Sequence, residues 1–201
     1  MSASNITRLF VLPLCAVAVL SAAGCASTVP ARIPLADKSV AVVPFSFRER
    51  RIDESEAGRM LATMLAGAIS AGLEGDVTVK PPLPAREFYS GRPVDKVKAE
   101  GVTMVLDVDC LILGHIERFT TRDPGMVGTF RGALQFTLFV FDRRGRLLLS
   151  QGISATYPYR QMDPEFVPVM NMSEEEVKMR TLQRAADLAS RLFYDCPTDR
   201  E

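Results

Sequence analysis

Residues 108–157 constrain the fold of this chain most. Their pattern of apolar and polar residues predicts two long strands, a tight turn and a third strand that runs back along the second. The run VDCLILGHIERF (108–119) predicts a central strand that is buried on both faces over 110–113 and alternates beyond Gly114. The run 130–141 predicts a strand with one apolar side. That side carries Phe130, Leu134, Phe136, Leu138 and Val140. A sheet built around this meander is therefore expected.

The turn between the last two strands is expected at Asp142-Arg143-Arg144-Gly145. Glycine there would supply the positive φ that such hairpin turns need. Residues 146–157 return as the partner strand. After an irregular segment at 158–172, Ser173 and Glu176 have the spacing of a capping box and predict the start of a last helix. Its expected apolar stripe is Val177, Leu182, Ala185, Ala186, Ala189, Leu192 and Phe193.

The first half of the chain reads as strand, helix, strand and helix. The apolar run 39–45 predicts a buried strand whose end Pro44 places at a sheet edge or bulge. A helix is expected from Asp53 or Ser55 to the glycines at 72 and 75. Its apolar face would be Ala57, Met60, Leu61, Met64, Leu65, Ala68 and Ile69. Residues 76–80 predict a short strand that the prolines after it break.

A further helix is expected to open at Pro93, with Val94, Val97 and Val102 facing inward, and Gly101 ends or interrupts it. Together these elements predict an α/β (α+β) domain with a single mixed sheet of about five strands and about two or three helices packed on it. The mature chain of about 175 residues is long enough for one such domain with a sizeable core.

Residues 9–25, LFVLPLCAVAVLSAAGC, hold no charge and follow a single basic residue, Arg8. The stretch is too short and too rich in small residues at its end for a membrane span, and it fits the core of a signal peptide. It ends in Ala22-Ala23-Gly24-Cys25, which resembles the lipobox of bacterial lipoproteins, although Ala22 departs from the usual Leu, Val or Ile. The alternatives are a plain secretory signal cut near Ala23 and an uncleaved anchor.

The lipobox resemblance implies cleavage before Cys25 and a lipid on its thiol, so that the chain is anchored in a membrane. Ala26 stands where an Asp retains such lipoproteins at the inner membrane, which implies the outer membrane. The expected organisation is a signal peptide at 1–24, a lipidated tether at 25–38, a periplasmic domain at 39–195 and a polar tail at 196–201.

The charge balance argues against one class of partner, and the cysteine content leaves two arrangements of the thiols open. Removal of Arg8 with the signal leaves 23 basic against 24 acidic residues, which argues against a nucleic-acid partner. Cys110 and Cys196 remain besides Cys25 in a compartment that permits disulfides. They form either a bridge or two separate thiols, and their spacing does not decide between these.

Few residues offer catalytic chemistry. His115 is the single histidine, and no spacing typical of a metal site accompanies it, so neither a metal nor a cofactor is expected. Asp107 and Asp109 flank Val108 and would form a carboxylate pair for acid–base catalysis, or simply the solvated entry to a strand. No sequence motif of a serine hydrolase or a nucleotide-binding loop is present. The chain is therefore interpreted as non-catalytic, with an enzyme as the minor alternative.

Two segments are candidates for binding a partner. Arg48, Arg50 and Arg51 form a basic loop, RERR, which is a solvated turn or a site for phosphate and lipid headgroups. In the segment 158–172, Phe166, Val169 and Met170 are apolar and need a cover. That cover is either the domain's own sheet or a partner protein that contacts the adaptable methionine surface.

The order of elements also resembles a class of periplasmic lipoprotein domains. VAVVPF, Gly58-x-x-Leu61, CLILGHI and FTLFVFDRRGRLLLSQ, with Asp109, Gly114, Asp142 and Gly145, match its pattern. The class includes the amino-terminal domain of TolB, the curli-secretion lipoprotein and the lipoprotein activator of penicillin-binding proteins. It implies an outer-membrane-anchored lipoprotein that binds a periplasmic or outer-membrane protein in envelope assembly, secretion or transport. An LptE-type lipopolysaccharide-assembly lipoprotein is similar too and implies direct binding of lipid or glycan.

Overall fold

The structure, a computed structural model, describes residues 28–47, 54–74, 76–80, 99–122, 130–158 and 172–197. Several predicted features lie outside these residues. They are Cys25, the arginines at 48, 50 and 51, the expected helix start at Pro93, and the apolar residues Phe166, Val169 and Met170. The signal peptide, the lipid anchor and both candidate partner-binding segments therefore stay predictions.

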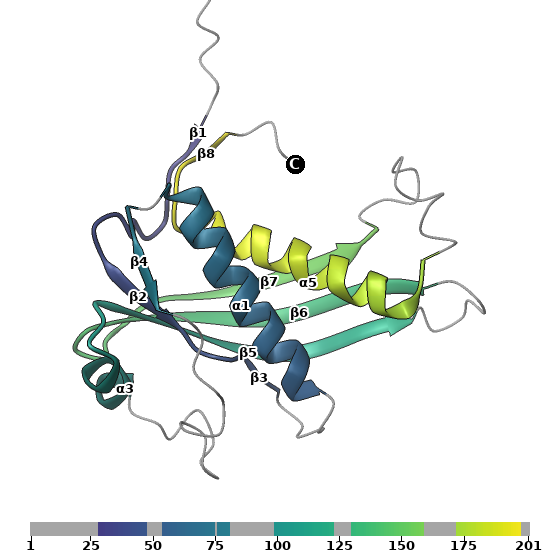
Figure 1. The fold of residues 1–201 in the computed structure, drawn as a ribbon, viewed down its shortest axis with the longest axis horizontal. Coiled ribbons are helices and arrows are strands. Elements are labelled where there is room, and N and C mark those ends of the chain that lie inside the picture. The colour runs from purple at the N-terminus through teal and green to yellow at the C-terminus, as the bar shows by residue number, and fades with distance from the viewer. Residues whose placement is uncertain are drawn as a thin grey trace, which may run out of the picture.

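The described chain forms a mixed six-stranded sheet with three helices, which confirms the predicted α/β class (Figure 1). The strands lie in the order β4-β2-β5-β6-β7, and β3 pairs with β5 beyond the end of β2. Their bounds are β2 Ser39–Val42, β3 Ser46–Phe47, β4 Thr78–Lys80, β5 Cys110–Arg122, β6 Phe130–Asp142 and β7 Leu147–Tyr157. β2 runs parallel to both neighbours, and β5, β6 and β7 are antiparallel. The break between β2 and β3 falls at Pro44, where an end was predicted.

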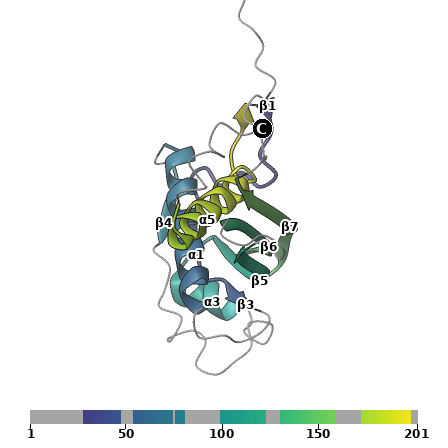
Figure 2. The ribbon, with the colours of Figure 1, turned by 90° about the vertical axis from the view of Figure 1, so that its right-hand side faces the viewer.

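Two helices, α1 (Glu54–Gly72) and α5 (Glu174–Ser190), cover one face of the sheet, here called the inner face (Figure 2). Leu61, Leu65 and Ile69 of α1 and Leu182 of α5 are fully buried against the strands. The strand side of this core is Val40, Val42, Ile112, Ile116, Leu134, Phe136, Leu138 and Val140. The predicted stripes of the two helices therefore meet one shared core.

The third helix, α3 (Ala99–Leu106), packs on the opposite, outer face at the β2 end of the sheet. It covers Ala41, Val43 and Leu111, whose chain neighbours face the inner core. Because both faces are covered here, these strands are apolar without alternation. Gly101 does not end this helix: it lies inside α3, which continues to Leu106.

The predicted hairpin is confirmed. Gly145 lies in the turn between β6 and β7 with φ of +72°, and its N–H donates to the Asp142 carbonyl at 2.9 Å. The Asp142 carboxylate accepts hydrogen bonds from the N–H groups of Arg144 and Arg146 at 2.9 and 2.8 Å. These bonds, led by the one from Arg146, lower the pKa of Asp142. The Asp142 carboxylate thus stabilises the turn through hydrogen bonds, and Gly145 adopts the positive φ that the turn requires.

Replacement of Gly145 by valine should destabilise the domain by roughly 2 kcal/mol or more, because two penalties act together. A β-branched residue is strained at this φ. In addition, a Cβ at this position would lie 2.6 Å from the backbone nitrogen of Glu100 in α3. Urea unfolding measures the loss. An unchanged midpoint for Gly145→Val would contradict both the positive φ at this position and the close approach of the turn to α3.

The capping box of α5 is confirmed in both directions. The Ser173 hydroxyl accepts from the Glu176 N–H at 3.2 Å, and the Glu176 carboxylate accepts from the Ser173 N–H at 2.8 Å. The bond from the Ser173 backbone is the main reason why the pKa of Glu176 is lowered. The capping box thereby satisfies backbone N–H groups at the N-terminus of α5 and fixes where the helix begins.

Part of the expected tether packs on the domain. Leu35 is fully buried, Ile33 is 8% exposed, and the N–H groups of Arg32 and Ile33 both donate to the Leu192 carbonyl. β1 (Thr28–Val29) pairs with β8 (Cys196–Pro197), so the described start of the polar tail is ordered beside the tether (Figure 1). The sequence predicts a tether over 25–38 because Pro30, Pro34 and small residues obscure the two side chains that are buried, Ile33 and Leu35.

Cys110 and Cys196 are both buried and are not joined to each other. Cys110 lies in the main core beside Val40, whereas Cys196 belongs to β8. Burial is the main cause that raises the pKa of the Cys110 thiol. Of the two alternatives left open by the sequence, the structure therefore contains two separate thiols.

Candidate functional site

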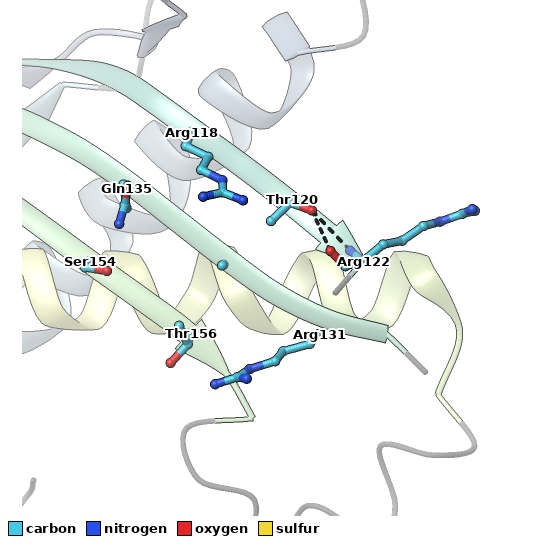
Figure 3. A pocket seen from close by; sticks show the side chains of 8 residues that line it. Arg118, Thr120, Arg122, Arg131, Gln135, Ser154 and Thr156 are labelled. Atoms are coloured by element: carbon cyan, nitrogen blue, oxygen red, sulfur yellow. Dashed lines mark hydrogen bonds between the residues drawn. The ribbon is translucent and has the colours of Figure 1, made fainter. Parts of the chain in front are cut away.

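The outer face of the sheet changes character along β5, β6 and β7. Near α3 it is apolar, and toward the far ends of the strands it is polar and exposed. Two rows of side chains cross the three strands there in register: Arg118–Gln135–Ser154, and Thr120–Ala133–Thr156. Arg122 and Arg131 complete the lining of a hollow over these rows (Figure 3). The hollow thus brings together residues from three strands that are far apart in sequence.

A bulge in β5 places Arg118 on this face. The register with β6 shifts between Ile116 and Arg118, so that one additional residue, Glu117, is accommodated. Ile116 and Phe119 both belong to the inner core although they are three positions apart. Without the bulge, strict alternation would turn Arg118 toward the core. This insertion is therefore what exposes the first arginine of the hollow.

The three arginines of the hollow have different surroundings. Arg122 donates to the Glu174 carboxylate at 2.8 Å, and the Thr121 hydroxyl donates to the same carboxylate at 2.6 Å. The hydrogen bond from Arg122 is the main cause that lowers the pKa of Glu174, which makes this a charged pair. The Arg122 guanidinium also lies 5.8 Å from the centre of the Phe130 ring. Arg122 is therefore held at the rim by an ion pair that anchors the start of α5.

Arg118 and Arg131 are exposed and lie on either side of the hollow. In Figure 3 the Arg131 side chain extends from β6 toward Thr156, and the Arg122 side chain points away from the other lining residues. Among the described residues that line the hollow, none is acidic. Glu117, which precedes Arg118 in the chain, accepts a hydrogen bond from Thr137 at 2.7 Å, one row closer to α3. The surface is therefore suited to an anion.

The size of the hollow favours a small group. Its volume is about 180 Å³ and it is open to solvent. Drug-sized ligands usually occupy pockets of roughly 300–1,000 Å³ that enclose most of the ligand. The Thr120 hydroxyl donates to the Arg122 carbonyl at 2.9 Å, whereas the hydroxyls of Ser154 and Thr156 and the amide of Gln135 supply further hydrogen-bonding groups beside the guanidinium groups. The arrangement is suited to a phosphate or carboxylate that belongs to a larger molecule.

The residues considered for catalysis take structural roles. Asp109 accepts hydrogen bonds from the Ser39 N–H and hydroxyl at 3.0 and 2.7 Å, and so joins the starts of β2 and β5. Arg143 of the hairpin donates to Asp107 at 2.8 Å and lies 3.7 Å from Asp109. The His115 Nδ1 lies 3.1 Å from the Ser46 hydroxyl. His115 is six residues along the strand from Asp109, or roughly 20 Å, so the three residues do not form one site.

The Asp109 bonds give a pH-dependent contribution to stability. The hydrogen bond from the Ser39 N–H, and next that from its hydroxyl, hold the pKa of Asp109 below its ordinary value of 3.8. A lowered folded-state pKa stabilises the domain above the unfolded value and ceases to do so as pH falls through the folded value. The free energy of unfolding of wild type should therefore exceed that of Asp109→Asn above about pH 5, and the two should converge below pH 3.8. Urea titrations from pH 2.5 to 7 check this, and a pH-independent difference would contradict it.

A second exposed feature lies at the α3 end of the molecule. Met104 and Val105 of α3 are 69% and 78% exposed. Leu147 and Leu148, which follow the hairpin, are 52% and 46% exposed. The hairpin contacts α3, since the Thr103 hydroxyl donates to the Arg143 carbonyl at 2.9 Å. Exposed large apolar side chains at one end of a domain are typical of a protein-contact surface.

Within the described ranges, no group of three or more His, Cys, Asp or Glu side chains is arranged to hold a metal ion. Among the described helices, none has both the length and the apolar character that a membrane span requires. The sequence-based search for a site missed all three arginines of the hollow, because they are isolated along the chain. The spacing of Ile116 and Phe119 was the one local signal, since it breaks the alternation.

Comparison with known proteins found no matching family model and no matching curated protein. Solved structures do match. The PelC dodecamer from Paraburkholderia phytofirmans is 14% identical with a TM-score of 0.46, and the match covers 80% of this chain and 93% of that one. Lipoprotein GNA1162 from Neisseria meningitidis is 16% identical with a TM-score of 0.44, over 66% of this chain and 92% of that one. The LpoB C-terminal domain from Salmonella enterica is 16% identical with a TM-score of 0.31, over 59% and 82%.

At these identities and TM-scores the likenesses assign the chain to no family.

Proposed function

We propose that this protein is a non-catalytic lipoprotein, anchored through Cys25 on the periplasmic face of the outer membrane, that binds an anionic group of another envelope component. The signal-like stretch 9–25 and Ala26 support the anchor and its location. The observation that carries the binding role is the arginine-lined hollow on the outer face of the sheet. A phosphate or carboxylate there would receive charge-assisted hydrogen bonds from Arg118 and Arg131.

The source of that anion is an envelope lipid headgroup or an acidic glycan. Both bear phosphate or carboxylate groups on a larger body, which an open hollow of about 180 Å³ admits. Neighbouring hydroxyls on Ser154 and Thr156 match the polar groups of a sugar or glycerol. This assignment develops the lipid-or-glycan alternative drawn from the sequence.

A protein partner is the second candidate, and the exposed Met104, Val105, Leu147 and Leu148 favour it. Such a partner in envelope assembly, secretion or transport would cover this apolar end and leave the arginine-lined hollow unused. The candidate segments at 48–51 and 158–172 would belong to the same role; residues 48–51 and 159–171 lie outside the described residues.

Titration calorimetry on the full chain in an uncharged detergent separates the candidates. The probes are soluble dihexanoyl phosphatidylglycerol and an oligogalacturonate, which represent the lipid and the glycan. Arg118→Ala should weaken binding about tenfold, the cost of one charge-assisted hydrogen bond. Arg144→Ala is the matched control, because Arg144 is exposed on the hairpin and does not line the hollow.

The outcomes distinguish an anion site in the hollow, a protein partner, and general electrostatic attraction to a basic surface. Binding that Arg118→Ala and Arg144→Ala weaken equally would reflect general charge attraction, and the hollow would not be the site. Absence of binding to either probe, together with stoichiometric capture of a protein that Met104→Ser and Val105→Ser abolish, would establish the protein partner instead.

A further inference from the structure

One edge of the sheet lacks the usual protection against pairing with another strand. β7 ends the strand order, and within the described residues it pairs only with β6. Its eleven residues, LLLSQGISATY, include no charged residue and no proline. Natural edge strands are commonly blocked by lysine, proline, a bulge or shortness. Apart from the register shift beside Leu147, β7 is long and regular.

The other edge of the same sheet has such protection. β4 has three residues and ends at Lys80, and the chain continues as Pro81-Pro82. A short strand followed by prolines offers few N–H and C=O groups to a new strand. Pro158 also follows β7, so the two edges differ in the length of the strand and in Lys80, and β7 is the longer and less protected edge.

We propose that β7 pairs with β7 of a second copy of this chain, antiparallel and about a two-fold axis at Gly152. Gly152 is the central residue of Leu147–Tyr157, so in this register the two copies of β7 overlap over their whole length. An ideal Cβ at Gly152 would have no heavy atom within 4 Å, so a side chain placed there has room on the face of the sheet. No other register overlaps the two strands over so much of their length.

The cross-strand pairs in this register are compatible. On the outer face Leu148 would lie opposite Thr156 of the second copy, and Ser150 opposite its Ser154. On the inner face Leu149 would lie opposite Ala155 of the second copy. The exposed Leu148 thereby gains a neighbour. An uncharged strand meets its own copy without repulsion, whereas a charged edge would select a partner of opposite charge.

Pairing would also extend the arginine-lined hollow. Ser154 and Thr156, which line it, would lie beside Ser150 and Leu148 of the second copy. Because the two-fold axis is perpendicular to a continuous sheet, both hollows would face the same direction. Two such sites on one surface bind a repeating anionic glycan or a lipid layer more tightly than one does. This consequence rests on the proposed function, whereas the pairing itself does not.

Disulfide trapping of the full-length chain in cell membranes tests the pairing. Gly152→Cys places two thiols opposite each other on the two-fold axis. Directly opposed residues have Cα atoms about 4.5–5.5 Å apart, which a disulfide spans. Mild oxidation should give a reducible dimer on a non-reducing gel. The wild-type chain, which retains the buried Cys110 and Cys196, is the baseline. It should run as a monomer on the same gel, because no disulfide joins its two copies.

The matched control is Ser154→Cys. In the proposed register its two copies lie roughly 14 Å apart along the strands, too far for a disulfide. Coexpression of differently tagged Ser150→Cys and Ser154→Cys chains should instead give a mixed dimer, and this pair leaves Gly152 intact. A monomeric Gly152→Cys chain together with no mixed dimer would overturn the proposal. Equal cross-linking of Gly152→Cys and Ser154→Cys alone would overturn it too, because it would reflect random collision.

Discussion

Replacement of Gly58 by alanine should destabilise the domain by roughly 2 kcal/mol or more, although alanine is normally the better helix former. α1 approaches the chain after β2 so closely that a Cβ at Gly58 would lie 2.1 Å from the Phe45 carbonyl oxygen. The Phe45 N–H in turn donates to the Gly58 carbonyl at 3.2 Å. Because the contact is with backbone, no side-chain rotation relieves it, and α1 must move away from the sheet.

The control for this substitution lies on the same helix. Gly67 has no heavy atom within 4 Å of an ideal Cβ, and it is exposed. Gly67→Ala should therefore stabilise the domain by about 0.5–1 kcal/mol through helix propensity alone. Urea unfolding of both variants should show shifts of opposite sign. If Gly58→Ala were as stable as Gly67→Ala, α1 would have to lie farther from Phe45 than the structure places it.

The parts of the fold that sequence predicts well depend on local patterns. The alternation in β6, the turn glycine at 145 and the capping box at Ser173 and Glu176 each act over a few residues. Such patterns specify their structure without knowledge of distant contacts. The two-sided burial of β2 and of the start of β5 was also visible, as apolar runs without alternation.

What sequence missed depends on pairing between distant segments. Leu35 is fully buried, but its surroundings in the chain are small residues and prolines that read as a linker. The hollow needs the register of three strands and a bulge at Glu117 to bring Arg118 and Arg131 to one face. A one-residue change in register turns a side chain to the other face, so an alternation pattern alone does not place these arginines.

The carboxylates of Asp107 and Asp109 resembled a catalytic pair in the sequence, and their contacts in the structure show why spacing alone misleads. Asp107 and Asp109 do lie near each other, since Arg143 contacts both. Their partners come from the hairpin and from Ser39, which sequence spacing does not reveal. The positive φ of Asp107, 48°, belongs to the turn that ends α3. Two acids flanking a buried valine therefore mark a junction of α3, β2 and β5.

Substitution of serine for Cys25 should abolish both lipidation and cleavage of the signal, the largest effect expected of any single change in this chain. In the lipoproteins whose lipobox Ala22-Ala23-Gly24-Cys25 resembles, the signal is cut before the cysteine and the cysteine thiol carries the lipid. Serine at position 25 leaves no thiol to carry that lipid. Metabolic labelling with a fatty acid should therefore leave Cys25→Ser unlabelled, and immunoblotting should find it at precursor size.

Cys15→Ser is the matched control, because Cys15 lies within the same apolar stretch but outside the lipobox. This variant should be labelled and processed like wild type, so that loss of label is specific to position 25. Fatty-acid label on Cys25→Ser would refute the lipid anchor. Processing of Cys25→Ser to mature size without label would instead favour a plain secretory signal cut near Ala23. Retention of the precursor at full size in wild type as well would favour the uncleaved anchor.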